Sequence, residues 1–149
     1  MKKELYRDYA VEAFRFFARE GGYEAFKTRL LVELPQRKEP RTHSGVSKPV
    51  EALTVKWEKA MEENAGALQD LQAVERLLQH LQTLPLAKDM RFALEEVYFE
   101  QPCRPLAKGE LLNRVRYVAT QRYVSERTVF SWLQAMRREF SKIRGLRLN

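Results

Sequence analysis

The chain has 149 residues, a formal net charge of +7 and one cysteine, Cys103. A single cysteine excludes an internal disulfide and a cysteine metal cluster, and it fits a reducing, cytoplasmic compartment. No apolar run approaches the roughly 18 residues of a membrane-spanning helix, and no apolar segment follows the first lysines, so we expect neither a membrane span nor a signal peptide. The basic charge favours a polyanionic partner, with nucleic acid first.

Residues 1–32 predict an N-terminal helical hairpin. Apolar side chains recur at spacings of three and four from Glu4 to Glu20 and again from Tyr23 to Val32, with a Gly-Gly pair between the two segments. The aromatic residues here could form a stacking platform for single-stranded nucleic acid. Aromatic residues at helical spacing are more often core, so we expect a core role. Residues 33–49 contain three prolines and no apolar period, which predicts a linker.

Residues 50–82 predict a long, coiled-coil-like helix. Two sets of positions repeat every seven residues: Val50, Trp57, Asn64, Leu71 and Leu78, and Leu53, Ala60, Ala67, Val74 and Leu81. One arrangement is a parallel homodimer through Val50–Leu81, in which a buried Asn64 pair would fix the register. The other is packing within one chain against the first two helices, and the additional apolar residues Met61 and Leu68 favour it because they widen the apolar stripe.

Residues 83–149 predict a helix-turn-helix domain. After a break at Thr83–Pro85, the periodicity indicates helices over 87–99, 106–122 and 125–144, the last closed by a glycine. The Ser125 hydroxyl can cap this last helix by accepting a hydrogen bond from the backbone N–H of Arg127 or Thr128. The small Ala119 permits a close helix crossing, and apolar residues fill the angle, namely Val124, Val129 and Trp132. The alternative is an ordinary helical hairpin, since Tyr123 stands where glycine adopts the turn more easily.

The excess of basic charge lies in the same region. From residue 104 to residue 149 there are 11 Lys and Arg against 3 Glu, so the charge accompanies the candidate motif. If the last helix lay in a major groove, its outer side would meet base edges through Ser125, Glu126, Arg127, Phe130, Ser131 and Gln134. The predicted phosphate contacts are Arg114, Arg116, Arg122, Arg137 and Arg138. Arg127 and Gln134 are the strongest candidates for base contacts, because Arg suits guanine and Gln suits adenine.

A resemblance to a known family extends this interpretation. The segments Leu84-Pro85, Arg91, Tyr98-Phe99 and VSERTV together resemble region 4 of bacterial sigma factors. The layout is similar to small phage and prophage transcription regulators of the ArpU and RinA type, over roughly residues 50 to 144. This resemblance implies a helical N-terminal part, a long helix and a C-terminal sigma-like helix-turn-helix. The sequence departs from sigma factors in two ways. The span from Tyr98 to Ala119 is longer than the one that sigma factors usually have, and Glu126 and Phe130 stand at positions that are often basic in sigma factors.

We therefore expect an all-α, sequence-specific double-stranded DNA-binding transcriptional regulator of phage or prophage origin. Whether it contacts RNA polymerase stays open. An enzyme is not expected, and neither is a cofactor or metal, since the sequence has no Gly-rich phosphate loop, His-rich metal spacing or nucleophile elbow. Two alternatives remain: a phage small terminase subunit, in which the DNA-binding part usually comes first, and a helical adaptor that does not bind nucleic acid.

Overall fold

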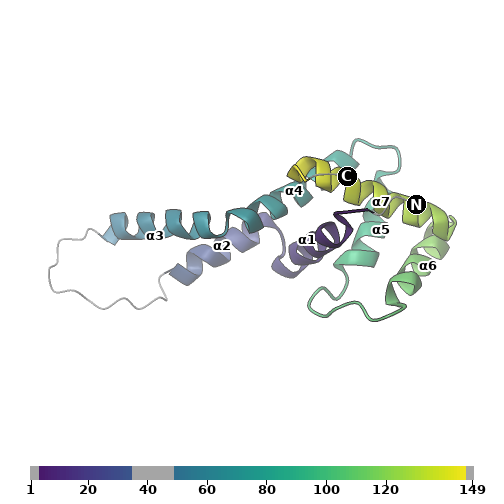
Figure 1. The fold of residues 1–149 in the computed structure, drawn as a ribbon, viewed down its shortest axis with the longest axis horizontal. Coiled ribbons are helices and arrows are strands. Elements are labelled where there is room, and N and C mark those ends of the chain that lie inside the picture. The colour runs from purple at the N-terminus through teal and green to yellow at the C-terminus, as the bar shows by residue number, and fades with distance from the viewer. Residues whose placement is uncertain (1–3, 35–48, 147–149) are drawn as a thin grey trace.

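The computed structural model describes residues 4–34 and 49–146, and every regular element within these residues is a helix (Figure 1). In chain order they are α1 (Arg7–Glu20), α2 (Tyr23–Glu33), α3 (Pro49–Glu63), α4 (Ala65–Leu81), α5 (Ala87–Leu94), the π-helix η2 (Glu95–Phe99), α6 (Glu110–Arg122) and α7 (Glu126–Arg144). The predicted all-α fold is confirmed. Most of the predicted linker, residues 35–48, lies outside the described residues.

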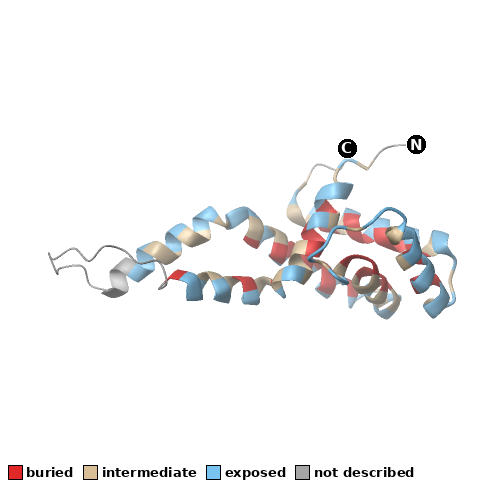
Figure 2. Cartoon of the chain, turned by 90° about the horizontal axis from the view of Figure 1, so that it is seen from below, coloured by how far each residue is buried: buried red, intermediate tan, exposed pale blue. Residues whose placement is uncertain are grey.

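The helices form a head and an arm (Figures 1 and 2). α1 and α4 to α7 gather in the head, whereas α2 and α3 project from it, and α4 leads from the arm into the head. The buried residues concentrate in the head (Figure 2). Within the described residues, none of the helices combines the length and the apolar composition that crossing a bilayer requires.

One core joins the N-terminal helix to the C-terminal helices. The Phe14 side chain of α1 is fully buried, and its ring centroid lies 5.7 Å from that of Tyr98 and 5.4 Å from that of Phe140 in α7. The expected core role of the N-terminal aromatic residues is therefore met at Phe14. Segments 1–32 and 83–149, which the sequence places in separate domains, contribute to the same core.

The predicted long helix is interrupted at Asn64. Its backbone leaves helical geometry, with φ −107° and ψ 17°, and its side-chain Nδ2 donates to the Ala60 carbonyl oxygen at 2.8 Å. The Asn64 backbone N–H also donates to the Ala60 oxygen, at 3.1 Å, and the Asn64 carbonyl oxygen accepts from the Leu68 N–H at 2.9 Å, so the interruption is a local distortion of the backbone angles. The prediction of one continuous helix over 50–82 is thus wrong: α4 follows α3 along the chain, with a bend between the two helices (Figures 1 and 2).

The two halves of the heptad pattern have different environments. In α4 the heptad positions Leu71, Val74 and Leu81 are almost completely buried, and α4 packs against α1 and α7. In α3, by contrast, Leu53 is 46% exposed. Packing within one chain, the second of the two arrangements considered, therefore describes α4. A homodimer through the whole Val50–Leu81 seam would need side chains that the chain's own core already encloses.

Two other helices differ from their predicted extents. The helix expected over 87–99 ends in the π-helical turn η2, and the helix expected over 106–122 begins only at Glu110. Gly109 precedes it in a left-handed conformation, with φ 83°, and the Glu110 carboxylate accepts a hydrogen bond from the Ala107 backbone N–H at 3.0 Å. This bond and an ion pair with Arg104 lower the pKa of Glu110 to about 2, with the Arg104 hydrogen bond as the larger cause.

Candidate nucleic-acid interface

The connection between α6 and α7 is a tight turn over residues 123–125. Tyr123 adopts a left-handed conformation, with φ 57° and ψ 41°, and the Val124 backbone N–H donates to the Ala119 carbonyl oxygen at 3.1 Å. A side chain other than glycine in this conformation costs roughly 1–2 kcal/mol. The Tyr123 side chain is 95% exposed, so packing does not offset that cost. The turn therefore forms with Tyr123 in the left-handed conformation, which glycine would adopt more easily.

Ser125 caps α7 as predicted. Its Oγ accepts a hydrogen bond from the Thr128 backbone N–H at 3.1 Å, so Thr128 is the partner among the two that the sequence allowed. Of the four residues expected where the helices meet, Ala119, Val129 and Trp132 are buried, and Val124 is partly buried against the same core. The cap and the buried contacts fix the angle at which α7 leaves the turn.

The outer side of α7 carries the six predicted base-contact residues, and each of them is exposed: Ser125, Glu126, Arg127, Phe130, Ser131 and Gln134. Four exposed residues at spacings of four, three and four share one side of the helix. We call these four the reading face: Arg127, Ser131, Gln134 and Arg138. Among the residues that the structure describes, neither arginine of this face has a hydrogen bond or an ion pair.

Glu126 lies at the edge of the reading face and is paired with α6. The Arg116 Nε donates to the Glu126 carboxylate at 2.8 Å, and both side chains are about half exposed. A predicted phosphate contact and a predicted base contact are therefore bonded to each other. The pair is accessible to solvent, where such ion pairs contribute about 0–1 kcal/mol. A phosphate or a base could consequently replace either partner at low cost.

Two of the predicted phosphate contacts have structural roles instead. Arg137 is 6% exposed, donates to both carboxylate oxygens of Glu4 at 2.9 and 3.0 Å, and donates to the Tyr98 hydroxyl at 2.8 Å. Arg114 donates to the carbonyl oxygens of Val97 and Glu100, at 2.9 Å each, and so satisfies the end of η2. We correct the prediction for both arginines, because their donors face protein acceptors and not a phosphate.

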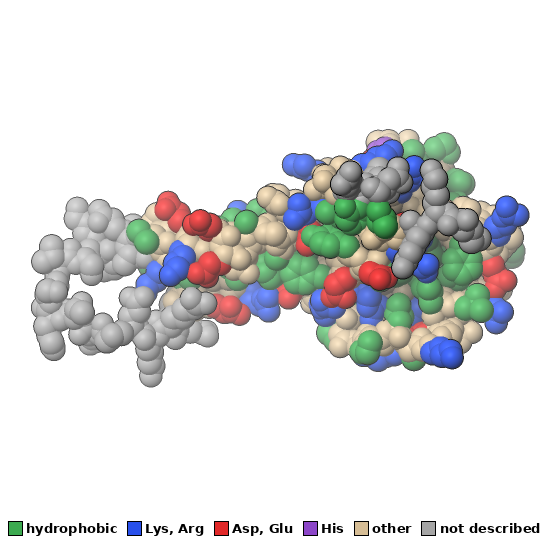
Figure 3. All heavy atoms as spheres, viewed as in Figure 1, with side chains coloured by type: hydrophobic (Ala, Val, Ile, Leu, Met, Phe, Trp, Pro, Cys, Tyr) green, Lys and Arg blue, Asp and Glu red, His purple; other side chains and the backbone are tan. Residues whose placement is uncertain are grey.

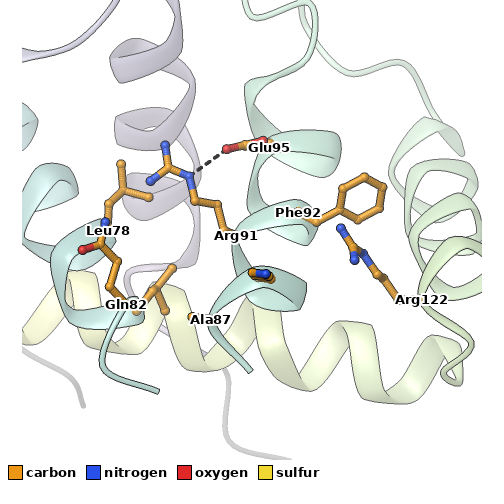
Figure 4. Close-up of a pocket in the computed structure, with 9 residues that line it drawn as sticks. Leu78, Gln82, Ala87, Arg91, Phe92, Glu95 and Arg122 are labelled. Carbon is orange, nitrogen blue, oxygen red and sulfur yellow. Dashed lines mark hydrogen bonds and ion pairs between the residues drawn. The ribbon is translucent and has the colours of Figure 1, made fainter. Parts of the chain in front are cut away.

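Arg122, a third predicted phosphate contact, lies against α5. Its guanidinium carbon is 4.2 Å from the centroid of the Phe92 ring, a cation–π distance (Figure 4). Its Nη1 is 3.4 Å from an Asp89 carboxylate oxygen. Of the predicted phosphate contacts, Arg116 and Arg138 are exposed. The basic side chains are also interspersed with acidic ones on the face shown in Figure 3, so charge alone does not single out one binding surface.

Sequence reasoning missed the contacts that hold α7 in place. Besides the Arg137 contacts, the Arg144 Nε donates to Asp70 of α4 at 2.7 Å, and the Tyr9 hydroxyl donates to the same carboxylate oxygen at 2.7 Å. Burial raises the pKa of Tyr98, and burial together with Asp70 raises the pKa of Tyr9. These contacts anchor the helix that carries the reading face to α1, α4 and the N-terminal residues.

Comparison of the chain with protein-family models, with curated proteins and with solved structures yields no match.

Proposed function

We propose that the protein is a sequence-specific, double-stranded DNA-binding transcriptional regulator that inserts α7 into a major groove. The supporting observation is the reading face: a capped helix presents Arg127, Ser131, Gln134 and Arg138 together, exposed, with both guanidinium groups unengaged among the described residues. The resemblance to ArpU and RinA regulators makes phage or prophage origin part of this proposal, and it makes RNA polymerase a partner to test by co-purification.

The spacing of the reading face suits successive base pairs. Arg127 and Gln134 are seven residues apart, which is about 10 Å along a helix axis and about three base-pair steps. Arg127 would donate to guanine O6 and N7, and Gln134 would form two hydrogen bonds with adenine. Phe130, which is 38% exposed, could touch a thymine methyl group. Arg116 and Arg138 would hold phosphates without reading sequence.

Selection of bound duplexes from a random pool, followed by fluorescence anisotropy at fixed salt, tests the proposal. Arg127→Ala should lose discrimination at one base pair by roughly 1–3 kcal/mol, whereas Arg138→Ala should weaken all sequences alike and reduce the salt slope by about one. Arg29→Ala on α2 is the matched control, because it removes the same charge from the arm. Absence of duplex binding at low salt would refute the proposal and favour an adaptor role.

The arm, formed by α2 and α3, is the surface that we propose for self-association. Leu53 and Val55 of α3 and Leu31 and Val32 of α2 are exposed, between 46% and 63%. If two chains met there, their reading faces would bind two half-sites. Sedimentation over a range of concentrations tests this, with Leu53→Glu expected to shift a dimer to a monomer. Ring-sized oligomers would contradict a dimer and favour the packaging alternative.

A further inference from the structure

A groove lies along α5, between the C-terminal end of α4 and the C-terminal end of α6 (Figure 4). It has a volume of about 370 Å³, and buried Leu78 and Leu81, Ala87 and the Phe92 ring supply its apolar lining. Sites for small molecules are usually concave, lined mostly by apolar side chains, and about 300–1,000 Å³ in volume, so this groove has the size and lining of such a site.

The polar groups of the groove are predominantly cationic. Lys88, Arg91 and Arg122 line it together with a single carboxylate, Glu95, which already accepts a hydrogen bond from the Arg91 Nε at 2.8 Å. Lys88 is exposed, and among the described residues it has neither a hydrogen bond nor an ion pair. The groove therefore combines an apolar floor with an excess of positive charge.

Arg122 contributes a donor that is not satisfied. Its Nε is buried and finds no hydrogen-bond partner among the described residues, while its Nη1 lies 3.4 Å from Asp89. Because this Nε is closed to solvent, a ligand meets the guanidinium at its Nη atoms, where an anion gains a charge-assisted hydrogen bond. The Arg122 guanidinium, the free Lys88 and the apolar floor point to one ligand chemistry.

We propose that this groove binds a small anionic amphiphile, a carboxylate with an unbranched apolar body. The carboxylate lies between Lys88 and Arg122, and the apolar body covers Leu78, Leu81 and Phe92. An inorganic anion would meet the cations and leave the apolar floor in water, so it binds more weakly. The site does not use the reading face, and the inference is therefore independent of DNA binding.

The experiment is calorimetric titration of the full-length chain with hexanoate, heptanoate and octanoate, all below their micelle concentrations. Each methylene that enters the groove should tighten binding about three- to fourfold. Octyltrimethylammonium, with the same body and opposite charge, should bind at least tenfold more weakly than octanoate, and inorganic phosphate should also bind weakly. Equal binding of octanoate and the ammonium, or affinity independent of chain length, overturns the proposal.

Substitutions of the groove residues test whether octanoate binds in this groove. Lys88→Gln and Arg122→Gln should each weaken octanoate binding about tenfold, and Lys108→Gln, which removes an exposed charge from the connector before α6, should leave it unchanged. Lys88 is exposed and makes no described contact, so its substitution tests the site even if Arg122→Gln perturbs packing against Phe92. Equal loss in Lys88→Gln and Lys108→Gln would show non-specific charge attraction and would overturn the assignment to this groove.

Discussion

The ion pair between Arg137 and Glu4 should contribute strongly to stability, and Glu4→Ala tests it. The Arg137 side chain is 7% exposed and the Glu4 side chain 27%, so the substitution leaves a nearly buried guanidinium with the Tyr98 hydroxyl as its remaining partner. Removing one partner of a buried pair costs about 3–5 kcal/mol. Because Glu4 is partly exposed, we expect a loss near the lower limit, about 3 kcal/mol in the free energy of unfolding.

Urea denaturation followed by circular dichroism measures this loss, which should also lower the melting temperature by roughly 6–12 °C in a chain of this size. Glu12→Ala is the matched control: Glu12 pairs with Arg19 at 2.7 Å, but their side chains are 65% and 32% exposed, so about 0–1 kcal/mol is expected. The double variant Glu4→Ala/Arg137→Met should recover stability relative to Glu4→Ala, because it removes the uncompensated charge. If Glu4→Ala cost no more than Glu12→Ala, the reasoning from burial would be refuted.

Three further predictions concern the head. Ser125→Ala should lower the free energy of unfolding by about 1 kcal/mol, because it removes the cap of α7. Ser131→Ala is the control, and equal stability of the two variants in urea would contradict a stabilising cap. Tyr123→Gly should stabilise the fold by about 0.5–1 kcal/mol by relieving the left-handed turn, and a lower melting temperature would argue against strain there. Burial raises the pKa of Tyr98, so the protonated side chain contributes fully to the free energy of unfolding below pH 10, and this contribution is lost as the pH rises through the folded-state pKa. Tyr98→Phe should therefore make the fall of urea-measured stability at alkaline pH less steep. An unchanged slope would be evidence against this.

The local features of α7 could be predicted from the sequence. Ser125 begins the helix, Gly145 ends it in a left-handed conformation with φ 81°, and the apolar residues Trp132, Met136 and Phe140, which follow one another at spacings of four, are buried. Capping and helical periodicity depend on residues within a few positions of each other, which is why a single sequence reveals them. The exposure of the predicted base contacts follows from the same periodicity.

Contacts between distant segments could not be predicted in this way. Arg137 and Glu4 are 133 positions apart, so nothing in the basic C-terminal segment distinguishes Arg137 from the exposed Arg138 beside it. A weak signal was present, because Arg137 stands four residues after the buried Leu133 and three before the buried Phe140, at the border of the inner face. The break at Asn64 was missed for a different reason: the heptad pattern continues through it, although the helix does not.

The position of α7 has a consequence for any attempt to transplant the reading face. One side of this helix is exposed, while the opposite side carries Phe140 into contact with Phe14 and holds Glu4 and Asp70 through its arginines. A fragment cut out at residue 83 would lose the surfaces that keep the helix straight and oriented. Chimeras that exchange specificity should therefore swap individual exposed side chains, since exchanging the whole segment would dismantle its support.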